Sequence, residues 1–197
     1  MTVSSIATGY DGISLLAGNA AYDPAGTFLI QRVAGTGSAG TISFTSIPQT
    51  YKHLQIRSIA RDTYNDGSSI LLDLQMQFNG DTGSNYTKHI LTGTGSSATA
   101  SGSASRTSME VAALPSATAT TSMMSGMVID ILDYTSTSKN KTVHSFSGMN
   151  GNAANTQYVV TLRSNLWMST SAITSITLTP ATAFTTTSTF ALYGMVG

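Results

Sequence analysis

The sequence has no cysteine and little charge. Asp, Glu, Lys and Arg make up 9% of its 197 residues, and the formal net charge is +0, whereas an average soluble domain carries roughly 25% charged residues. The absence of cysteine excludes disulfides and thiolate chemistry and fits folding in a reducing cytoplasm. Because net charge keeps copies of a protein apart, so neutral a chain suits a protein that lies against its neighbours.

Targeting and nucleic-acid signals are missing as well. No hydrophobic run is long enough to cross a bilayer, and the N-terminus has no basic segment followed by an apolar stretch, so we expect neither a membrane partner nor a secretory signal. The basic residues form no stripe, which disfavours nucleic acid as a partner. These scattered residues include Arg32, Lys52, Arg57, Arg61 and Arg163.

Period-two alternation of apolar and polar residues dominates what remains, and it indicates strands with one buried face. The clearest case is 70–78, and no stretch holds a helical pattern for three turns. We therefore predict an all-β protein, an antiparallel two-sheet β-sandwich of the jelly-roll type, over 27–197. The other predicted strands are 53–61, 123–132, 158–163, 176–179 and 190–195, with shorter candidates at 27–33, 41–46, 86–91, 108–112 and 142–146.

Two segments lack this alternation. Residues 1–26 are rich in small residues and are predicted to form an extended N-terminal arm, which would add a strand to a neighbour or cross its surface. Residues 92–105 are low in complexity, with no side chain whose burial offsets ordering, and are predicted to be a flexible loop. The apolar residues expected to make assembly contacts are Tyr10, Ile13, Leu15, Leu16, Tyr22 and Phe28.

Motifs for cofactors and metals are weak. Residues 35–40 spell GxGxxG, but a strand-like segment follows where a dinucleotide site needs a helix, so we interpret them as a turn between strands. The histidines His53, His89 and His144 lie on separate predicted strands without metal-ligand spacing. Residues 79–85 carry oxygen ligands, but EF-hand spacing is absent and a turn is favoured over a calcium site. We expect no cofactor and no metal.

The carboxylates do not point to catalysis. Glu110 is the single glutamate, while Asp130 and Asp133 flank the end of a predicted strand, where Asp133 is interpreted as part of a turn. No nucleophile motif accompanies them. We therefore predict that the protein is not an enzyme, and a glycan hydrolase or esterase using Glu110 or Asp133 is the minor alternative.

Five segments, taken in order, resemble segments that recur in structural proteins of tailed bacteriophages. The resemblance is carried by the set, covers about residues 28–197, and brings no catalytic residues with it. It implies a virion component, with major capsid or tail proteins and copies of itself as partners. The segments are FTSIPQTYKHLQIR (44–57), FNGDTGSNY (78–86), IDILDY (129–134), LWMSTSAITSITL (166–178) and FALYG (190–194).

We therefore expect a bacteriophage virion structural protein that folds in the host cytoplasm. Its expected role is that of a capsid decoration, or cement, protein, which stabilises the shell through its arm and apolar contacts and self-associates as a trimer. The alternative is a tail fibre or tail-tip module that recognises a host surface glycan, with Tyr64, Tyr86 and Trp167 stacking on sugar rings. A place in the core is the favoured interpretation of Trp167 itself.

Overall fold

The structure is a computed structural model and describes residues 7–8, 14–15, 26–151 and 158–196. The arm predicted over 1–26 lies largely outside these residues. Two short strands within it, β1 (Ala7–Thr8) and β2 (Ser14–Leu15), pair antiparallel. None of the described residues lies in a helix, so this part of the chain contains no helix that would cross a membrane.

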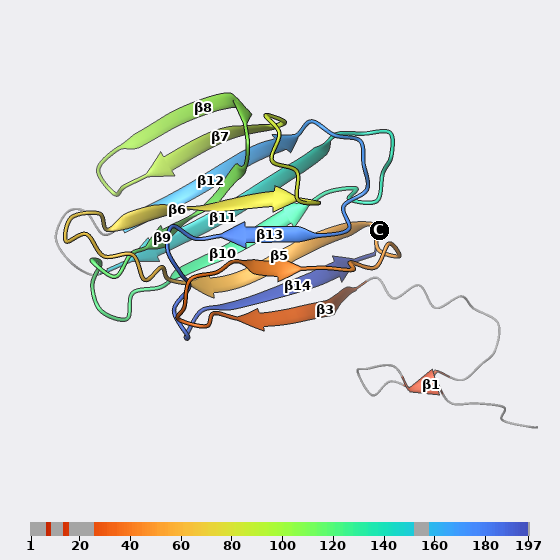
Figure 1. Cartoon of the computed structure of the whole chain (residues 1–197), viewed down its shortest axis with the longest axis horizontal. Coiled ribbons are helices and arrows are strands. Elements are labelled where there is room, and N and C mark those ends of the chain that lie inside the picture. Colours follow the sequence, from red (N-terminus) through yellow and green to blue (C-terminus); the bar gives the residue numbers. More distant parts are fainter. Residues whose placement is uncertain (1–6, 9–13, 16–25, 152–157, 197) are drawn as a thin grey trace, which may run out of the picture.

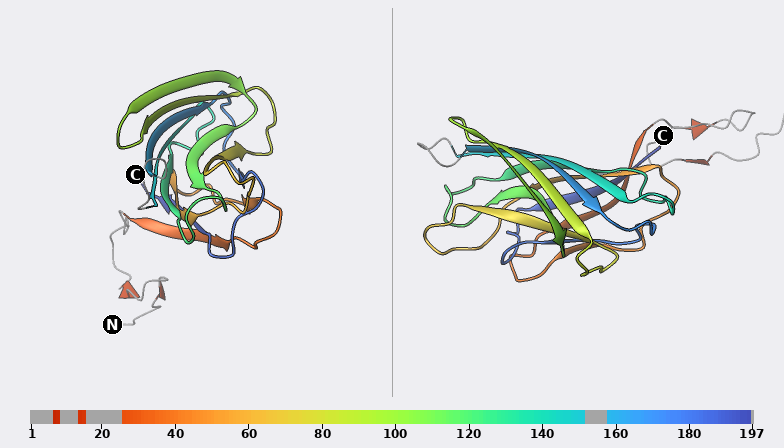
Figure 2. Two further views of the ribbon diagram at one scale, coloured as in Figure 1. Left: turned by 90° about the vertical axis from the view of Figure 1, so that its left-hand side faces the viewer. Right: turned by 90° about the horizontal axis from the view of Figure 1, so that it is seen from above.

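Two antiparallel sheets pack face to face (Figures 1 and 2). The large sheet has eight strands, in the order β3 (Thr27–Ala34), β14 (Thr189–Met195), β5 (His53–Ala60), β10 (Ser125–Ile131), β11 (Lys141–Asn150), β12 (Tyr158–Trp167), β7 (Tyr86–Gly93) and β8 (Ala98–Arg106). The small sheet has four strands, in the order β4 (Ile42–Phe44), β13 (Ile176–Thr179), β6 (Leu71–Phe78) and β9 (Met109–Pro115).

This architecture confirms the predicted all-β, two-sheet antiparallel sandwich. Its first strand, β3, begins at Thr27. The jelly-roll arrangement is not confirmed, because the sheets contain eight and four strands, whereas a jelly roll has eight strands in two Greek keys.

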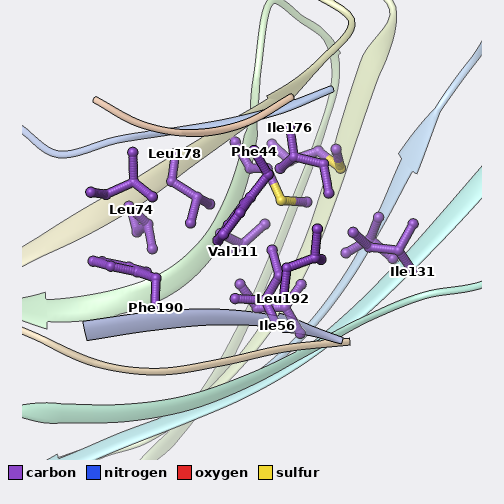
Figure 3. Packing of buried hydrophobic residues seen from close by; sticks show 14 of the residues in the cluster. Phe44, Ile56, Leu74, Val111, Ile131, Ile176, Leu178, Phe190 and Leu192 are labelled. Carbon is purple, nitrogen blue, oxygen red and sulfur yellow. The ribbon is translucent and has the colours of Figure 1, made fainter. Parts of the chain in front are cut away.

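The core lies between the sheets and is built by the alternation seen in the sequence (Figure 3). On β6, Leu74, Met76 and Phe78 are fully buried, which confirms the strand predicted over 70–78. Facing them from the large sheet are Ile56 on β5 and Leu192 on β14. Burial of each such side chain contributes about 1.5–3 kcal/mol, so this layer supplies much of the driving force for folding.

The flexible loop predicted over 92–105 is wrong. β7 ends at Gly93 and β8 begins at Ala98, and the two strands pair as a hairpin with Leu91 opposite Ala100. Its turn is closed by a hydrogen bond from the Thr94 N–H to the Ser97 carbonyl (3.0 Å). β8 needs only backbone hydrogen bonds to β7, so its small, exposed side chains carry no alternation that would reveal a strand.

Arg61 and Asp62, which follow β5, hold the connecting loops together. The buried Arg61 guanidinium donates hydrogen bonds to the carbonyls of 117, 119, 120 and 123. The fully buried Asp62 carboxylate accepts the N–H groups of Tyr64 (2.9 Å) and Ala181 (2.7 Å). Two adjacent side chains thus tie loops from distant parts of the chain to the end of one strand.

We expect Asp62→Ala to lower the free energy of unfolding by about 2 kcal/mol, because it leaves the buried N–H of Ala183 and part-buried N–H groups such as that of Tyr64 without their acceptor. Asp66→Ala is the control, since Asp66 accepts N–H groups in an exposed loop where water replaces it. We expect that variant to lose less than about 1 kcal/mol. Urea unfolding measures both, and equal losses would contradict the role of Asp62.

Candidate interaction surface

Near the β8 edge of the large sheet, apolar side chains face outward and polar side chains face the interior. On β12, Val160 and Leu162 are 44% and 54% exposed, while Thr161 and Arg163 on the opposite side are buried. Alternation correctly predicted the strand over 158–163, but burial of its apolar side would place Val160 and Leu162 in the core. The structure instead turns them outward.

The outward apolar side chains form one row across adjacent strands. Phe146 on β11 pairs with Leu162, which pairs with Leu91 on β7, which pairs with Ala100 on β8. Phe146 is 55% and Leu91 50% exposed. We call Leu91, Phe146, Val160 and Leu162 the outer patch, and they line a shallow groove of about 280 Å³. Contiguous exposed apolar side chains of this kind mark binding sites in soluble proteins.

Two glycines lower the surface beside the outer patch. Gly126 on β10 pairs with Gly148 on β11, and the row continues from Ile59 on one side to Val160 on the other. A Cβ placed on Gly126 would meet nothing within 4 Å. The two glycines therefore leave a gap between the exposed side chains of Ile59 and Val160, where a partner's side chain would fit.

Beneath the outer patch, the inner side of the same strands is charged. The Glu110 carboxylate on β9 binds the Lys88 ammonium of β7 and the Arg106 guanidinium at the end of β8 (2.5 Å). Arg163 reaches from β12 to Asp73 on β6 (2.8 Å). These ion pairs join the two sheets and use the inward positions, so the apolar residues that alternate with them must face outward.

Most residues expected to make assembly contacts fall outside what the structure describes. Tyr10, Ile13, Leu16 and Tyr22 lie outside the described residues, and only the backbone of Leu15, in β2, is described. Their role stays a prediction. Phe28 is half-buried, and its ring stacks on Tyr51 with centroids 6.0 Å apart.

The aromatic residues considered for glycan stacking are mostly unavailable. Tyr86 and Trp167 are buried and stack on each other with centroids 6.4 Å apart, which confirms the core interpretation of Trp167. Tyr64 is half-buried. The Trp167 indole N–H donates to the Asp81 carboxylate (2.7 Å), and the Tyr86 hydroxyl donates to the Asp81 carbonyl (3.0 Å).

The turn interpretation of 79–85 is confirmed. The Asp81 carboxylate also accepts the Gly83 N–H (2.8 Å) and the Asn85 amide, so its oxygens serve the turn itself. Hydrogen bonds from Trp167 and then Asn85 lower the pKa of Asp81. Among the described residues, no group of three or more His, Cys, Asp or Glu is arranged to hold a metal ion.

The GxGxxG segment connects β3 to β4, as predicted. Gly37 has a φ of +76°, which favours glycine, and a Cβ on Gly35 would lie 2.8 Å from the Phe184 Cβ. Both glycines therefore serve the chain's own packing. No helix N-terminus follows in the described chain to hold a pyrophosphate.

The histidines lie on three different strands, β5, β7 and β11, as expected. His53 Nδ1 accepts the N–H of Asp133, which sits in a turn at a φ of +47°. Hydrogen bonds from Lys139 (2.7 Å) and then Lys52 lower the pKa of Asp133 to about 2. Asp133 is therefore held as part of a turn, as the sequence indicated.

One cross-strand row contains the residue types of a hydrolytic triad. Asp130, His144 and Ser164 occupy neighbouring positions on β10, β11 and β12. Within the described residues, no hydrogen bond joins Asp130 to His144 or His144 to Ser164. Asp130 instead accepts a hydrogen bond from Gln55 (2.7 Å). The row therefore lacks the linked geometry that nucleophilic catalysis requires.

The basic residues lie at separate positions in the fold and have different roles. Arg61 and Arg163 are buried and bind other parts of the fold, whereas Arg32 and Arg57 lie exposed on the outer face of β3 and β5.

The sequence did not predict the outer patch. The alternation that includes Val160 and Leu162, and the serines on either side of Phe146, shows that these strands have an apolar side and a polar side. Alternation alone does not show which of the two sides faces the core.

Comparison of the chain with protein-family models, with curated proteins and with solved structures found no match in any of the three.

We expect Glu110→Gln to lower the free energy of unfolding by about 2 kcal/mol, because it leaves the partly buried Lys88 and Arg106 without their anion. Asp66→Asn, in an exposed loop where the carboxylate accepts only N–H and hydroxyl groups, is the control and should cost less. Denaturant titration of both variants measures the effect. Unchanged stability in Glu110→Gln would show that the ion pairs do not hold the sheets together.

Tyr86 gives the fold a pH dependence. Burial raises the pKa of its phenol to about 12, against about 10 in an unfolded chain. The unfolded chain therefore releases this proton first, and the free energy of unfolding falls as pH rises from about 10 towards 12.

Tyr86→Phe should remove the fall in the free energy of unfolding that this phenol causes at alkaline pH. The substitution also removes the hydrogen bonds of the hydroxyl. Urea midpoints at about pH 9 and about pH 11 should differ less in Tyr86→Phe than in the wild type. Tyr64→Phe serves as the control. An unchanged difference in Tyr86→Phe would contradict burial of the phenol.

Proposed function

We propose that this chain is a bacteriophage virion structural protein, and specifically a capsid decoration protein that contacts the shell through its outer patch. The observation that carries the proposal is the row Phe146–Leu162–Leu91, which is half-exposed. The inward residues next to Phe146 and Leu162 are polar, namely Ser145, Ser147, Thr161 and Arg163. The ion pairs of Lys88 and Arg163 hold Leu91 and Leu162 outward. The virion setting comes from the resemblance of five segments to phage structural proteins.

The segments that carry this resemblance and the residues of the outer patch do not overlap. The segments supply core residues such as Phe44, Ile56, Phe78, Ile131 and Trp167. All four residues of the outer patch lie between the segments. Under the proposal, the resembling segments build the sandwich, and the outer patch determines which partner this particular chain binds.

The energetics favour a contact made by many copies. A fully buried Leu or Phe contributes about 1.5–3 kcal/mol, so covering a half-exposed one adds about 1 kcal/mol. Four such side chains add about 4 kcal/mol, at the low end of the cost of association. The outer patch therefore needs further contacts in the assembled particle, either from neighbouring copies or from the arm.

The electrostatics are compatible with close docking. Glu110 pairs with both Lys88 and Arg106 on the inner side, which leaves one net positive charge there, and none of the four residues of the outer patch is charged. A partner would cover this part of the sheet without desolvating an unpaired charge, which is the usual obstacle to a tight interface.

The double variant Phe146→Thr/Leu162→Thr tests the proposal. Threonine suits an exposed strand position, so we expect the variant to fold with the stability of the wild type within about 1 kcal/mol. Its occupancy on virions should fall at least about tenfold, because roughly 2 kcal/mol of contact is lost. Leu29→Thr, an equally exposed leucine on the far strand β3, should keep full occupancy.

Quantitative mass spectrometry of purified virions measures occupancy, and immunogold labelling locates the chain. The proposal is supported if the label lies on the head and if occupancy falls for the double variant but not for Leu29→Thr. Label on the tail would overturn it in favour of the tail-fibre alternative. Full occupancy of the double variant would show that the outer patch is not the contact.

A further inference from the structure

The two sheets have four edge strands, and three of them are protected. β4 is only three residues long, and β9 is buried along its length and ends at Pro115. β3 carries the exposed Arg32, and its register against β14 shifts at Ile30. Short length, burial, proline, charge and irregularity are the means by which proteins prevent unwanted pairing at sheet edges.

The fourth edge, β8, has few of these protections (Figure 1). Within the described chain it pairs with β7 alone, and residues 98–102 are exposed on both faces of the strand. No charge or proline occurs from 94 to 105. Its irregularity is confined to the end, where the register against β7 shifts between Ser103 and Arg106 and Ser105 has a φ of +54°. Residues 98–103 thus offer a regular row of backbone groups to another strand.

We propose that β8 of one copy pairs antiparallel with β8 of a second copy, joining two large sheets across a two-fold axis. Each edge would satisfy the backbone groups of the other, and the combined sheet would have sixteen strands, eight from each copy. The proposal concerns the isolated protein in solution and does not depend on the proposed role in the virion.

Charge placement favours this arrangement. Arg106, the single charged residue of β8, lies at the C-terminal end of the strand. Antiparallel pairing puts the two Arg106 residues at opposite ends of the contact, whereas parallel pairing would place them side by side. The side chains of 98–103 are Ala, Thr, Ser and Gly, which fit against their own copies without steric conflict.

Continuity with the outer patch favours a second copy over an unrelated strand. The row Phe146–Leu162–Leu91 ends at Ala100, on the open edge itself. Two-fold pairing continues this row into the same row of the second copy, so two outer patches become parts of one surface. A two-fold interface is self-complementary by definition and is the commonest contact in homo-oligomers.

His89 shapes the same edge. Its imidazole occupies the space above Gly102, where a Cβ would lie 2.8 Å from Nε2. The glycine lets β8 approach β7 beneath the imidazole ring. Because it has no side chain, nothing projects from the outer face of β8 at this position. Glycine at a strand position often marks such close approach.

Because the chain has no cysteine, single cysteines report the pairing without background. We expect cysteines placed one at a time at 98–103 to form disulfide-linked dimers at one position or two adjacent positions, nearest the two-fold axis. Facing Cα atoms of antiparallel strands are about 4.5–5.5 Å apart, within disulfide range. Thr27→Cys and Ala34→Cys on the β3 edge are the controls and should stay unlinked.

Thr99→Lys/Ser101→Lys tests the pairing by charge. Light scattering should show a dimer for the wild type and a monomer for this variant, with the same circular dichroism spectrum. The matched variant Thr27→Lys/Ala34→Lys, with its charges on β3, should remain a dimer. A monomeric wild type, or a trimer whose cysteines at 98–103 do not react, would overturn the proposal.

The double variant of the outer patch separates this inference from the proposed function. Phe146→Thr/Leu162→Thr should remain a dimer in solution while losing its place on virions. A wild-type chain that dimerises through β8 but is absent from heads would overturn the decoration role alone. A chain that decorates heads with unreactive β8 cysteines would overturn the pairing alone.

Discussion

The ion pairs between the two sheets are the constraint on which the outer surface depends. Glu110 draws Lys88 and Arg106 inward, and Asp73 does the same for Arg163. Because side chains alternate along a strand, every inward charged residue forces its neighbours outward. The exposed apolar row is therefore not a defect of packing. It is the necessary counterpart of a polar layer beneath it.

This division places two kinds of packing in one sandwich. Over β5, β10 and β14, apolar side chains fill the space beneath the small sheet in the ordinary way. Towards β12, β7 and β8, the contact with β9 becomes ionic and hydrogen-bonded, as where Asn165 donates to the Glu110 carbonyl (3.2 Å). The apolar surface and the open edge meet at the same end of the large sheet. Both proposed contacts, with a shell and with a second copy, therefore use one continuous region.

Much of the fold followed from the sequence, and the misses have physical causes. The strands over 53–61, 70–78 and 123–132 were predictable because each buries one apolar side. β8 was missed because an edge strand with both faces exposed needs no apolar residues, only backbone pairing. The outer patch was missed because the sidedness of β12 depends on Asp73, which lies far away in the sequence and comes from the other sheet.

The sequence by itself determined an all-β, disulfide-free sandwich and the turn at 79–85, because alternation and turn residues act over a few neighbouring positions. Only the tertiary structure decided how strands are shared between the sheets, which side of β12 is buried and which edge stays open. Those outcomes depend on charges and backbone groups that meet across the fold, and no local pattern records which of them will meet.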